Sequence, residues 1–230
     1  MKLLILGAFA LAACQPADGG SQSAPGSITK DTPRVPASDS ARADEILQRA
    51  DAARIQGSPN APVWIVEVSD FQCPFCRQWH DEVYPTIVRD FIKPGIVRMA
   101  YVNLALPQHE HAVPAAEAAL CAGLQDRFWP MHDKLFDTQR HWVPLADARA
   151  YFDSLALSVG VRAPEFRQCL QSQLMRRIIS GDRTRATASG VQSTPTFFVG
   201  DQPIVGVGSV AAFRAAILRA RAKSGGRPPR

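Results

Sequence analysis

The stretch APVWIVEVSDFQCPFC, residues 61–76, contains the strongest structural signal in the chain. Its part Val63–Ser69 is rich in β-branched and apolar side chains, which is typical of a mostly buried strand. Apolar side chains recur at helical spacing between Cys73 and Phe91, so a helix follows the strand directly. The sequence therefore predicts a strand, a short turn and a helix that opens on the CPFC motif.

The position of this motif at the start of a helix has consequences for its two thiols. Backbone N–H groups at a helix N-terminus lack intrahelical partners and, together with the helix dipole, favour a thiolate there. Thiols in Cys-x-x-Cys motifs have pKa values of about 3.5–7, against about 8.5 for a free cysteine. Pro74 suits the first helical position, where its missing N–H is no loss. We expect Cys73 to be the exposed nucleophile and Cys76 the buried thiol that closes a small disulfide with it.

Three other roles of the CPFC motif are weaker. A structural zinc site needs two further ligands, and His80 is too far along the helix from Cys76 to complete it. A purely structural disulfide with so short a loop would constrain the unfolded chain little. A cysteine hydrolase would lose its nucleophile to oxidation in an exported compartment. Redox chemistry is therefore the favoured function.

The rest of the chain continues an α/β pattern. Ile96–Leu106 predicts a second strand, and residues 108–190 are helical in pattern without a convincing strand. Further predicted elements are helices at 115–124, 129–138, 145–155 and 164–189, strands at 196–199 and 204–207 around a turn at 200–203, and a last helix at 210–223 with Ser209 as its N-cap. The order is β-α-β, a block of helices, then β-β-α.

Residues 61–76 resemble the active-site segment of the DsbA-like thiol:disulfide oxidoreductases, a family of the thioredoxin superfamily. The stretches AALC (118–121), FWPMHDKLF (128–136) and GVQSTPTFFVG (190–200) also agree with this family, so that the resemblance runs from about residue 54 to 222. It implies an α/β thioredoxin fold over residues 41–230, with a helical insertion at about 108–190 between the β-α-β and β-β-α halves.

The resemblance also implies roles for residues outside the CPFC motif. Thr194-Pro195 matches the family's cis-proline loop, which faces the two cysteines and offers its backbone to a substrate strand; an ordinary trans proline is the alternative. Glu67 matches a buried acid that relays a proton to or from Cys76, whereas an exposed position on an edge strand is the alternative. The best-known members have histidine where this chain has Phe75, so we expect a milder oxidant.

Cys121 and Cys169 lie on apolar faces of predicted helices in the insertion. In an oxidising compartment a structural disulfide is favoured over two inert core thiols. Closing the 48-residue span between them would stabilise the fold by about 4 kcal/mol in the chain-entropy model.

The N-terminus has the pattern of an export signal. Lys2 precedes the apolar residues 3–13, a stretch too short for a membrane-spanning helix of about 20 residues. This signal ends in LAAC, which resembles the lipobox of bacterial lipoproteins and implies lipid attachment at Cys14. An ordinary signal cleaved just before Cys14 is the alternative. Residues 14–40 are rich in Pro, Gly and Ser and predict a flexible tether.

These features predict a protein of the bacterial cell envelope that faces the periplasm and is held to membrane lipid through Cys14. Gln15 after the lipidated cysteine favours the outer membrane. Its expected partners are unfolded or reduced secreted proteins and, by resemblance, a membrane quinone-linked thiol oxidase. We expect a monomer, although the predicted helix 41–56 is also compatible with an oligomerisation stalk.

The chain of 230 residues is 46% hydrophobic and 20% charged, which excludes wholesale disorder and fibrous classes. Its net charge is +5, but six basic residues fall in the last 17 positions, which predicts a frayed, solvated tail at 223–230. No basic and aromatic pattern supports nucleic-acid binding. The histidines at 109, 111 and 132 are assigned to loops, packing or capping, so we expect no metal and no organic cofactor.

Two other functions remain open. A disulfide isomerase or reductase would use the same scaffold but would be kept reduced, and isomerases usually dimerise through a dedicated domain. A Cu(I)-binding metallochaperone would use the two thiolates as ligands and would not oxidise peptides.

Overall fold

The structure is a computed structural model that describes residues 39–225. The predicted signal peptide, Cys14, nearly all of the predicted tether and most of the predicted frayed tail lie outside these residues. The elements are α1 (Asp39–Ala53), β1 (Ile55–Gln56), β2 (Val63–Ser69), α2 (Pro74–Glu82), α3 (Tyr84–Ile87), the π-helix η1 (Val88–Ile92), β3 (Val97–Asn103), α4 (Ala112–Gly123), α5 (Phe128–Asp137), α6 (Gln139–Trp142), α7 (Arg149–Ser158), α8 (Ala163–Ser172), α9 (Arg176–Ala188), β4 (Thr196–Val199), β5 (Gln202–Val205) and α10 (Val210–Lys223).

The strands form one mixed sheet in the order β1-β3-β2-β4-β5. Strands β2 and β3 are parallel, with Val63 opposite Val97. Strand β4 is antiparallel to β2 and places Phe197 opposite Glu67, while β1 and β5 pair antiparallel at the two edges. Strand β2 is therefore the centre of the sheet, and the CPFC motif follows its carboxyl end.

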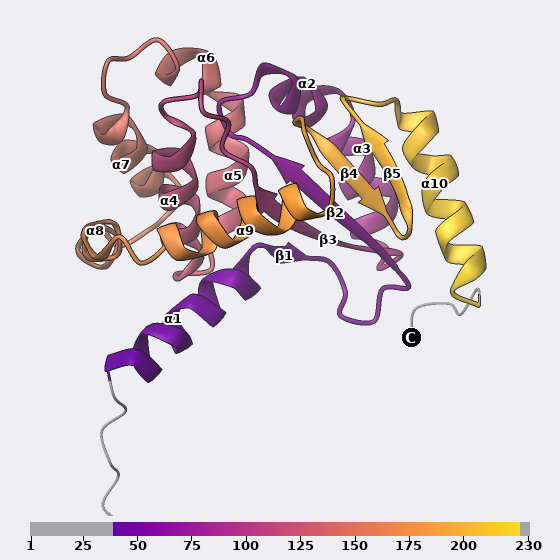
Figure 1. The fold of residues 1–230 in the computed structure, drawn as a ribbon, viewed down its shortest axis with the longest axis horizontal. Helices are drawn as coiled ribbons and strands as arrows, with labels where there is room; N and C mark the ends of the chain where they lie inside the picture. Colours follow the sequence, from indigo (N-terminus) through magenta and orange to yellow (C-terminus); the bar gives the residue numbers. More distant parts are fainter. Residues whose placement is uncertain (1–38, 226–230) are drawn as a thin grey trace, which may run out of the picture. The chain divides into compact units, whose positions relative to one another are not determined.

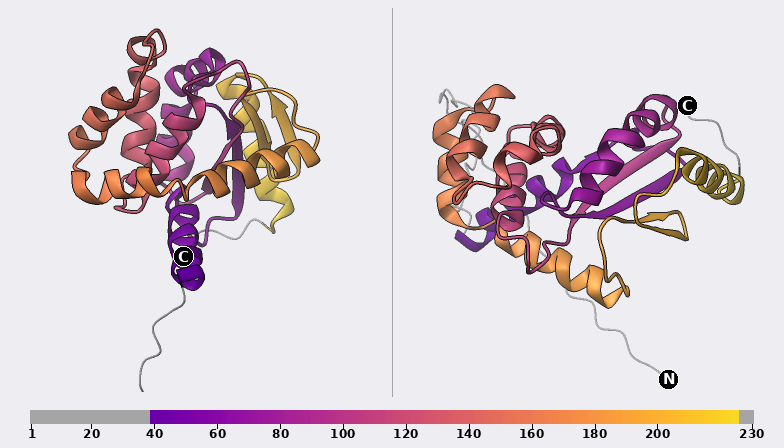
Figure 2. Two further views of the ribbon diagram at one scale, coloured as in Figure 1. Left: turned by 60° about the vertical axis from the view of Figure 1, so that its left-hand side comes forward. Right: turned by 90° about the horizontal axis from the view of Figure 1, so that it is seen from above.

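Helices cover both faces of this sheet, as Figure 2 shows. On one face, Ile65 of β2 packs in a cluster with Trp79 of α2 and Phe213 of α10. On the other face, Val68 packs with Ala186 of α9. Strand β2 is thus buried on both sides, which explains why its sequence is apolar almost throughout.

Helices α4 to α9 lie between β3 and β4 in the chain. Helices α4 to α8 form a block beside the sheet, and α9 runs from this block across a face of the sheet (Figure 1). Helix α4 is buried along nearly its whole length and contacts α1, α5, α7 and α8. A core cluster joins this block to the active-site segment, since it includes Cys73, Cys76 and Leu120. The predicted α/β fold, with a helical insertion between a β-α-β half and a β-β-α half, is confirmed.

Several element boundaries differ from the sequence prediction, each for a local reason. The predicted helix 73–91 is broken near Pro85, because proline lacks the N–H that an unbroken helix needs there. The predicted helix 164–189 is broken at Gln173, which has a left-handed backbone with φ of 54°. The second hairpin strand begins two residues earlier than predicted, because Pro203 is tolerated on an edge strand.

The predicted helix 41–56 begins at Asp39 and ends at Ala53, and the two residues of β1 follow it. Gly57 comes directly after this strand with φ of +95°, and a Cβ atom there would lie 2.5 Å from the Val97 carbonyl oxygen. Glycine therefore fits this close approach of the chain to β3.

Candidate active site

The CPFC motif lies at the junction between β2 and α2. Asp70 follows β2 and turns the chain, since its Oδ1 accepts a hydrogen bond from Gln72 N at 2.8 Å and its carbonyl accepts one from Cys73 N at 3.0 Å. Cys73 is the N-cap residue of α2, with an extended backbone, and Pro74 occupies the start of the helix. The motif thus opens the helix where the sequence analysis placed it.

Cys73 is more enclosed than the sequence analysis predicts, since only 3% of the residue is exposed. Its Sγ lies 3.5 Å from the backbone oxygen of Thr194. The side chain of Gln139, on α6, donates hydrogen bonds to the carbonyls of Phe71 and Cys73 at 2.7 and 3.0 Å. These segments are distant in the sequence and cover the motif from two sides, so the prediction of an exposed Cys73 is corrected.

The two thiols are free and differ sharply in acidity. The hydrogen bond from Cys76 is the main reason why the pKa of Cys73 falls to about 6, and Thr194 and the first backbone N–H groups of α2 contribute further. Burial raises the pKa of Cys76 well above its ordinary value, and the neighbouring Cys73 raises it further. A thiolate is therefore favoured at Cys73 and a protonated thiol at Cys76.

The loop that precedes β4 lies opposite the motif. A cis peptide bond joins Thr194 to Pro195, and the Thr194 carbonyl oxygen is the one that faces the Cys73 thiol. Thr194 itself is buried, and its side chain helps to lower the pKa of Cys73. The loop therefore presents both the backbone carbonyl and the side chain of Thr194 to the reacting sulfur.

Glu67 lies on the central strand β2 and is fully buried. Within the described part of the chain neither of its carboxylate oxygens has a hydrogen-bond partner. Burial raises its pKa to about 8, and the nearby Ser69 hydroxyl opposes this shift. Ser69 also adjoins the Cys76 thiol and the Tyr101 hydroxyl. The structure therefore places Glu67 at a buried position and not on an exposed edge.

Three residues that organise this site were missed by the sequence analysis. Asp70 uses its second carboxylate oxygen to accept hydrogen bonds from Leu106 N and the His109 ring, both at 2.8 Å. Gln139 and Ser69 act as described above. Only Asp70 had a sequence signal, a charged residue between a buried strand and a cysteine motif, since the partners of the other two are set by tertiary packing.

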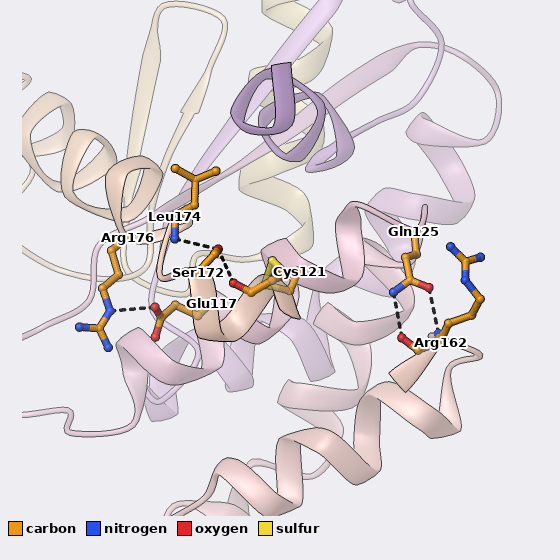
Figure 3. Close-up of a disulfide and its surroundings, with 8 residues drawn as sticks. Glu117, Cys121, Gln125, Arg162, Ser172, Leu174 and Arg176 are labelled. Carbon is orange, nitrogen blue, oxygen red and sulfur yellow. Dashed lines mark hydrogen bonds and ion pairs between the residues drawn. A yellow bond between two sulfur atoms is a disulfide. The ribbon is translucent and has the colours of Figure 1, made fainter. Parts of the chain in front are cut away.

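Cys121 of α4 and Cys169 of α8 are joined by a disulfide, with their Cα atoms 5.7 Å apart (Figure 3). The end of α8 is held by Ser172, whose Oγ donates to the Cys169 carbonyl at 2.6 Å. Gln125, just after α4, exchanges two hydrogen bonds with the backbone of Arg162, just before α8. The disulfide is thus part of a wider connection between these two helices, away from the two free thiols.

A Cys-x-x-Cys motif at the start of the helix after a central strand, opposite a cis-proline loop, defines the class of thioredoxin-fold thiol proteins. The family model described as thioredoxin matches residues 49–219. Disulfide bond formation protein D of Bacillus subtilis is 30% identical over 160 residues, which are 65% of this chain and 68% of that protein. The chain belongs to the thioredoxin family, and within it to the DsbA-like thiol:disulfide oxidoreductases, which confirms the predicted family.

Solved structures agree with this assignment. BdbD from Bacillus subtilis in its oxidised form is 26% identical, with a TM-score of 0.67 over 73% of this chain and 91% of that chain. Alpha-DsbA1 from Wolbachia pipientis, at 21% identity, has a TM-score of 0.66 over 74% of this chain and 92% of that chain. The second similarity concerns the fold alone.

Another group of relatives is named for a different activity. Na(+)/H(+) antiporter NhaA 3 of Salinispora tropica is 36% identical over 185 residues, which are 78% of this chain and 27% of the antiporter. The chain therefore spans about a quarter of that relative's length, and the antiporter's activity is not carried over. Among residues 39–225, no helix has the length and apolar character needed to cross a membrane.

Proposed function

We propose that this protein is an exported thiol:disulfide oxidoreductase that introduces disulfides into unfolded or reduced secreted proteins through Cys73 and Cys76. The observation that carries the proposal is the position of the two free thiols at the start of α2 against the cis Thr194–Pro195 loop. The opposite shifts of their pKa values agree with it. A low pKa at Cys73 stabilises the reduced form as a thiolate, and a stable reduced form makes the oxidised form a stronger oxidant. The same asymmetry makes Cys73 the sulfur that leaves readily.

The reaction proceeds in two exchange steps. A substrate thiolate attacks Cys73 Sγ of the Cys73–Cys76 disulfide, and a mixed disulfide forms as the Cys76 thiolate leaves. A second substrate thiolate then attacks the substrate sulfur of the mixed disulfide, which forms the substrate disulfide and releases the Cys73 thiolate. Two electrons pass from the substrate to the protein, which is left as the dithiol.

Glu67 is placed to supply the proton that Cys76 takes up in this reaction. Cys76 leaves as a thiolate but, with its raised pKa, is stable in the buried site only when it is protonated. The pKa of about 8 keeps Glu67 largely protonated near neutral pH, so the carboxyl group can supply that proton. The Ser69 hydroxyl adjoins both groups and can carry the proton between them.

The substrate binds over the surface around the motif. The backbone of Thr194 faces Cys73 and supports pairing with an extended substrate segment. Phe75 is 59% exposed, which is unusual for so large an apolar side chain, and it lies between the two cysteines in the sequence. An apolar side chain here suits substrates that are not yet folded and still expose apolar residues.

The N-terminal sequence indicates where in the cell this reaction takes place. The protein is exported, lipid-anchored through Cys14 and acts as a monomer on the periplasmic side, with residues 14–40 as its tether. Because no oxidant is built into the dithiol, each turnover ends with a reduced protein that needs re-oxidation. A membrane quinone-linked thiol oxidase supplies that step.

Trapping of the mixed disulfide tests the proposal. The full chain carrying C14S and C76A is first charged at Cys73 with an aromatic disulfide and then mixed with a reduced peptide that contains a single cysteine. We expect a covalent peptide adduct on Cys73 within the time in which the wild-type disulfide oxidises a dicysteine peptide. The C14S/C73A/C76A variant is the matched control and should form no adduct. Oxidation of the dicysteine peptide by C73A at the wild-type rate would overturn the assignment.

A further inference from the structure

A second cluster of polar side chains lies where α2 packs against α5, and the proposed thiol chemistry does not use it. It consists of His80 from α2 and the neighbours His132 and Asp133 from α5. One potential ligand atom from each residue lies within 4.8 Å of the other two. Both histidines are buried, whereas the Asp133 side chain is 46% exposed.

The Asp133 carboxylate lies between the two imidazole rings. Its Oδ1 is 2.8 Å from His132 Nδ1 and 3.4 Å from His80 Nε2. Tetrahedral zinc with bonds of about 2.0–2.1 Å holds neighbouring ligand atoms roughly 3.3 Å apart. The contact between Asp133 and His80 already has this spacing, and the contact with His132 needs to open by only about half an ångström.

Hydrogen bonding alone leaves His132 incompletely satisfied. If its Nδ1 donates to Asp133, its Nε2 is a fully buried acceptor without a partner in the described part of the chain. The ring also packs edge-to-face against Tyr101 and Phe136, at centroid distances of 5.3 and 5.0 Å. A cation on Nδ1 would move the ring proton to Nε2, and an N–H suits these aromatic surroundings better than a lone pair does.

The surroundings of His80 also suit a metal ligand. While its Nε2 faces Asp133, its Nδ1 lies 3.5 Å from Asp81 Oδ1. A histidine that binds a metal through one nitrogen usually donates the N–H of the other to a carboxylate or carbonyl, which orients the ring. Asp81 is placed to accept from that N–H.

The cluster is also open to solvent on one side. A pocket of about 660 Å³ is lined by His80, Asp133 and Asp137, together with Arg89 and Lys93. Asp137 lies one helical turn after Asp133 on α5. The positive charge of Arg89 is paired with Asp90, which leaves Asp133 and Asp137 beside the single cation of Lys93 on this side of the pocket.

We propose that His80, His132 and Asp133 form a binding site for a divalent transition metal ion, with Zn²⁺ as the best match. Two imidazoles and one carboxylate are a donor set that zinc takes in proteins, usually with an open fourth position. In this site the fourth position faces the pocket and is open to water. The metal would join α2, which carries Cys76, to α5 of the helical block.

Zinc binding to the untagged full-length chain tests the site. All proteins carry C14S and are used with Cys73 and Cys76 oxidised to the disulfide, so that no free thiol competes for the metal. Titration calorimetry with zinc chloride should give one ion per chain, and zinc should raise the Tm. The D133N variant should bind at least about tenfold more weakly and lose the rise in Tm.

Two further variants make the result decisive. H80Q should weaken binding like D133N, while H141Q, at an exposed histidine on α6, should bind within about twofold of wild type. D133N changes a partly exposed side chain, and its Tm without zinc establishes that it folds. Absence of one-to-one binding, or equal affinities of D133N and H141Q, would overturn the proposal.

Discussion

Cys73 and Cys76 are three residues apart, yet their surroundings shift their pKa values in opposite directions. Cys73 accepts the hydrogen bond of the Cys76 thiol at the start of α2. Cys76 lies beneath it and is wholly buried, so the loss of solvent disfavours its charged form. The acidity of Cys73 therefore depends chiefly on the neighbouring thiol of Cys76.

Removal of that thiol should raise the pKa of Cys73 from about 6 toward its ordinary value. C76A removes the largest stabilising interaction of the thiolate, whereas C76S keeps a hydroxyl donor at the same place and should shift the pKa less. The pH dependence of thiolate absorbance, or of the rate of alkylation by iodoacetamide, measures the midpoint in each reduced protein. A midpoint in C76A that stays near 6 would show that the helix start alone controls Cys73.

Glu67 makes stability depend on pH in a defined direction. Its pKa is about 8 in the folded protein and near 4.5 when unfolded, so the folded state holds the proton more tightly. The contribution of Glu67 to the free energy of unfolding is fully present below the pKa that the group has in the unfolded chain. It is lost as the pH rises through the pKa that the group has in the folded protein. The loss is roughly 5 kcal/mol in total at about 1.4 kcal/mol per pKa unit.

E67Q should therefore become more stable than the wild type as the pH rises. The difference between the two free energies of unfolding, from urea denaturation, should grow in favour of E67Q between pH 5 and about 9, by several kcal/mol. The difference isolates Glu67, because the other titrating groups are common to both proteins. A difference that stays constant over this range would contradict a buried, proton-binding Glu67.

Some properties of these residues could be predicted from the sequence and others could not. The helix start at Cys73 follows from local patterning, and so does the burial of Cys76. The covering of Cys73 by Gln139 and Thr194 could not be foreseen, because these residues are 66 and 121 positions away. That β2 is a central strand, so that Glu67 is buried and not exposed at an edge, likewise became clear only from the strand order.

Among the elements, those with a strong local signal match the structure best. The strands Val63–Ser69 and Thr196–Val199 and the helix Val210–Lys223 have their predicted bounds. The two-residue strand β1 is too short to have a pattern of its own, and it exists because Ile55 pairs with Ala100 of β3. The helical spacing of apolar residues did not predict the breaks at Pro85 and Gln173, because in each case a single residue interrupts a pattern that is otherwise helical.

The disulfide between α4 and α8 gives a prediction at this scale. C121A/C169A should lower the free energy of unfolding by about 4 kcal/mol, because a loop of 48 residues regains its freedom in the unfolded chain. Urea denaturation of the oxidised proteins measures the change. Q168A, at an exposed neighbour on α8, is the control and should change stability by less than about 0.5 kcal/mol. A loss below about 1 kcal/mol in the double variant would count against a structural role.

At the scale of the whole molecule, one buried ion pair connects segments far apart in the chain. Arg54, just after α1, pairs with Asp182 of α9, and Asp182 also accepts hydrogen bonds from the backbone and side chain of Asn103 on β3, both at 2.9 Å. Although burial opposes its charge, Asp182 keeps the pKa of Arg54 above its ordinary value. No sequence pattern relates residues 54 and 182, so this connection could not be predicted.

Loss of Asp182 should therefore affect the entire fold. D182A leaves the buried guanidinium of Arg54 with only the partly exposed Asp51 carboxylate and the Tyr101 carbonyl as partners, and should lower the free energy of unfolding by about 3–5 kcal/mol. The exposed pair of Asp201 and Lys223 provides the comparison, since D201A should cost less than about 1 kcal/mol. Similar losses in the two variants, measured by urea denaturation, would show that Arg54 finds other partners.

If the whole protein is a disulfide-forming oxidant, the reduction potential of Cys73–Cys76 must be high enough for the pair to oxidise substrate thiols. The protein is equilibrated with glutathione buffers, alkylated, and assayed by mass spectrometry for this pair alone, so that Cys121–Cys169 does not enter the value. We predict a potential of about −120 to −180 mV, at which the reduced form is the stable one. A potential of about −230 mV or below would contradict the account and indicate a reductase or isomerase that depends on a reducing partner.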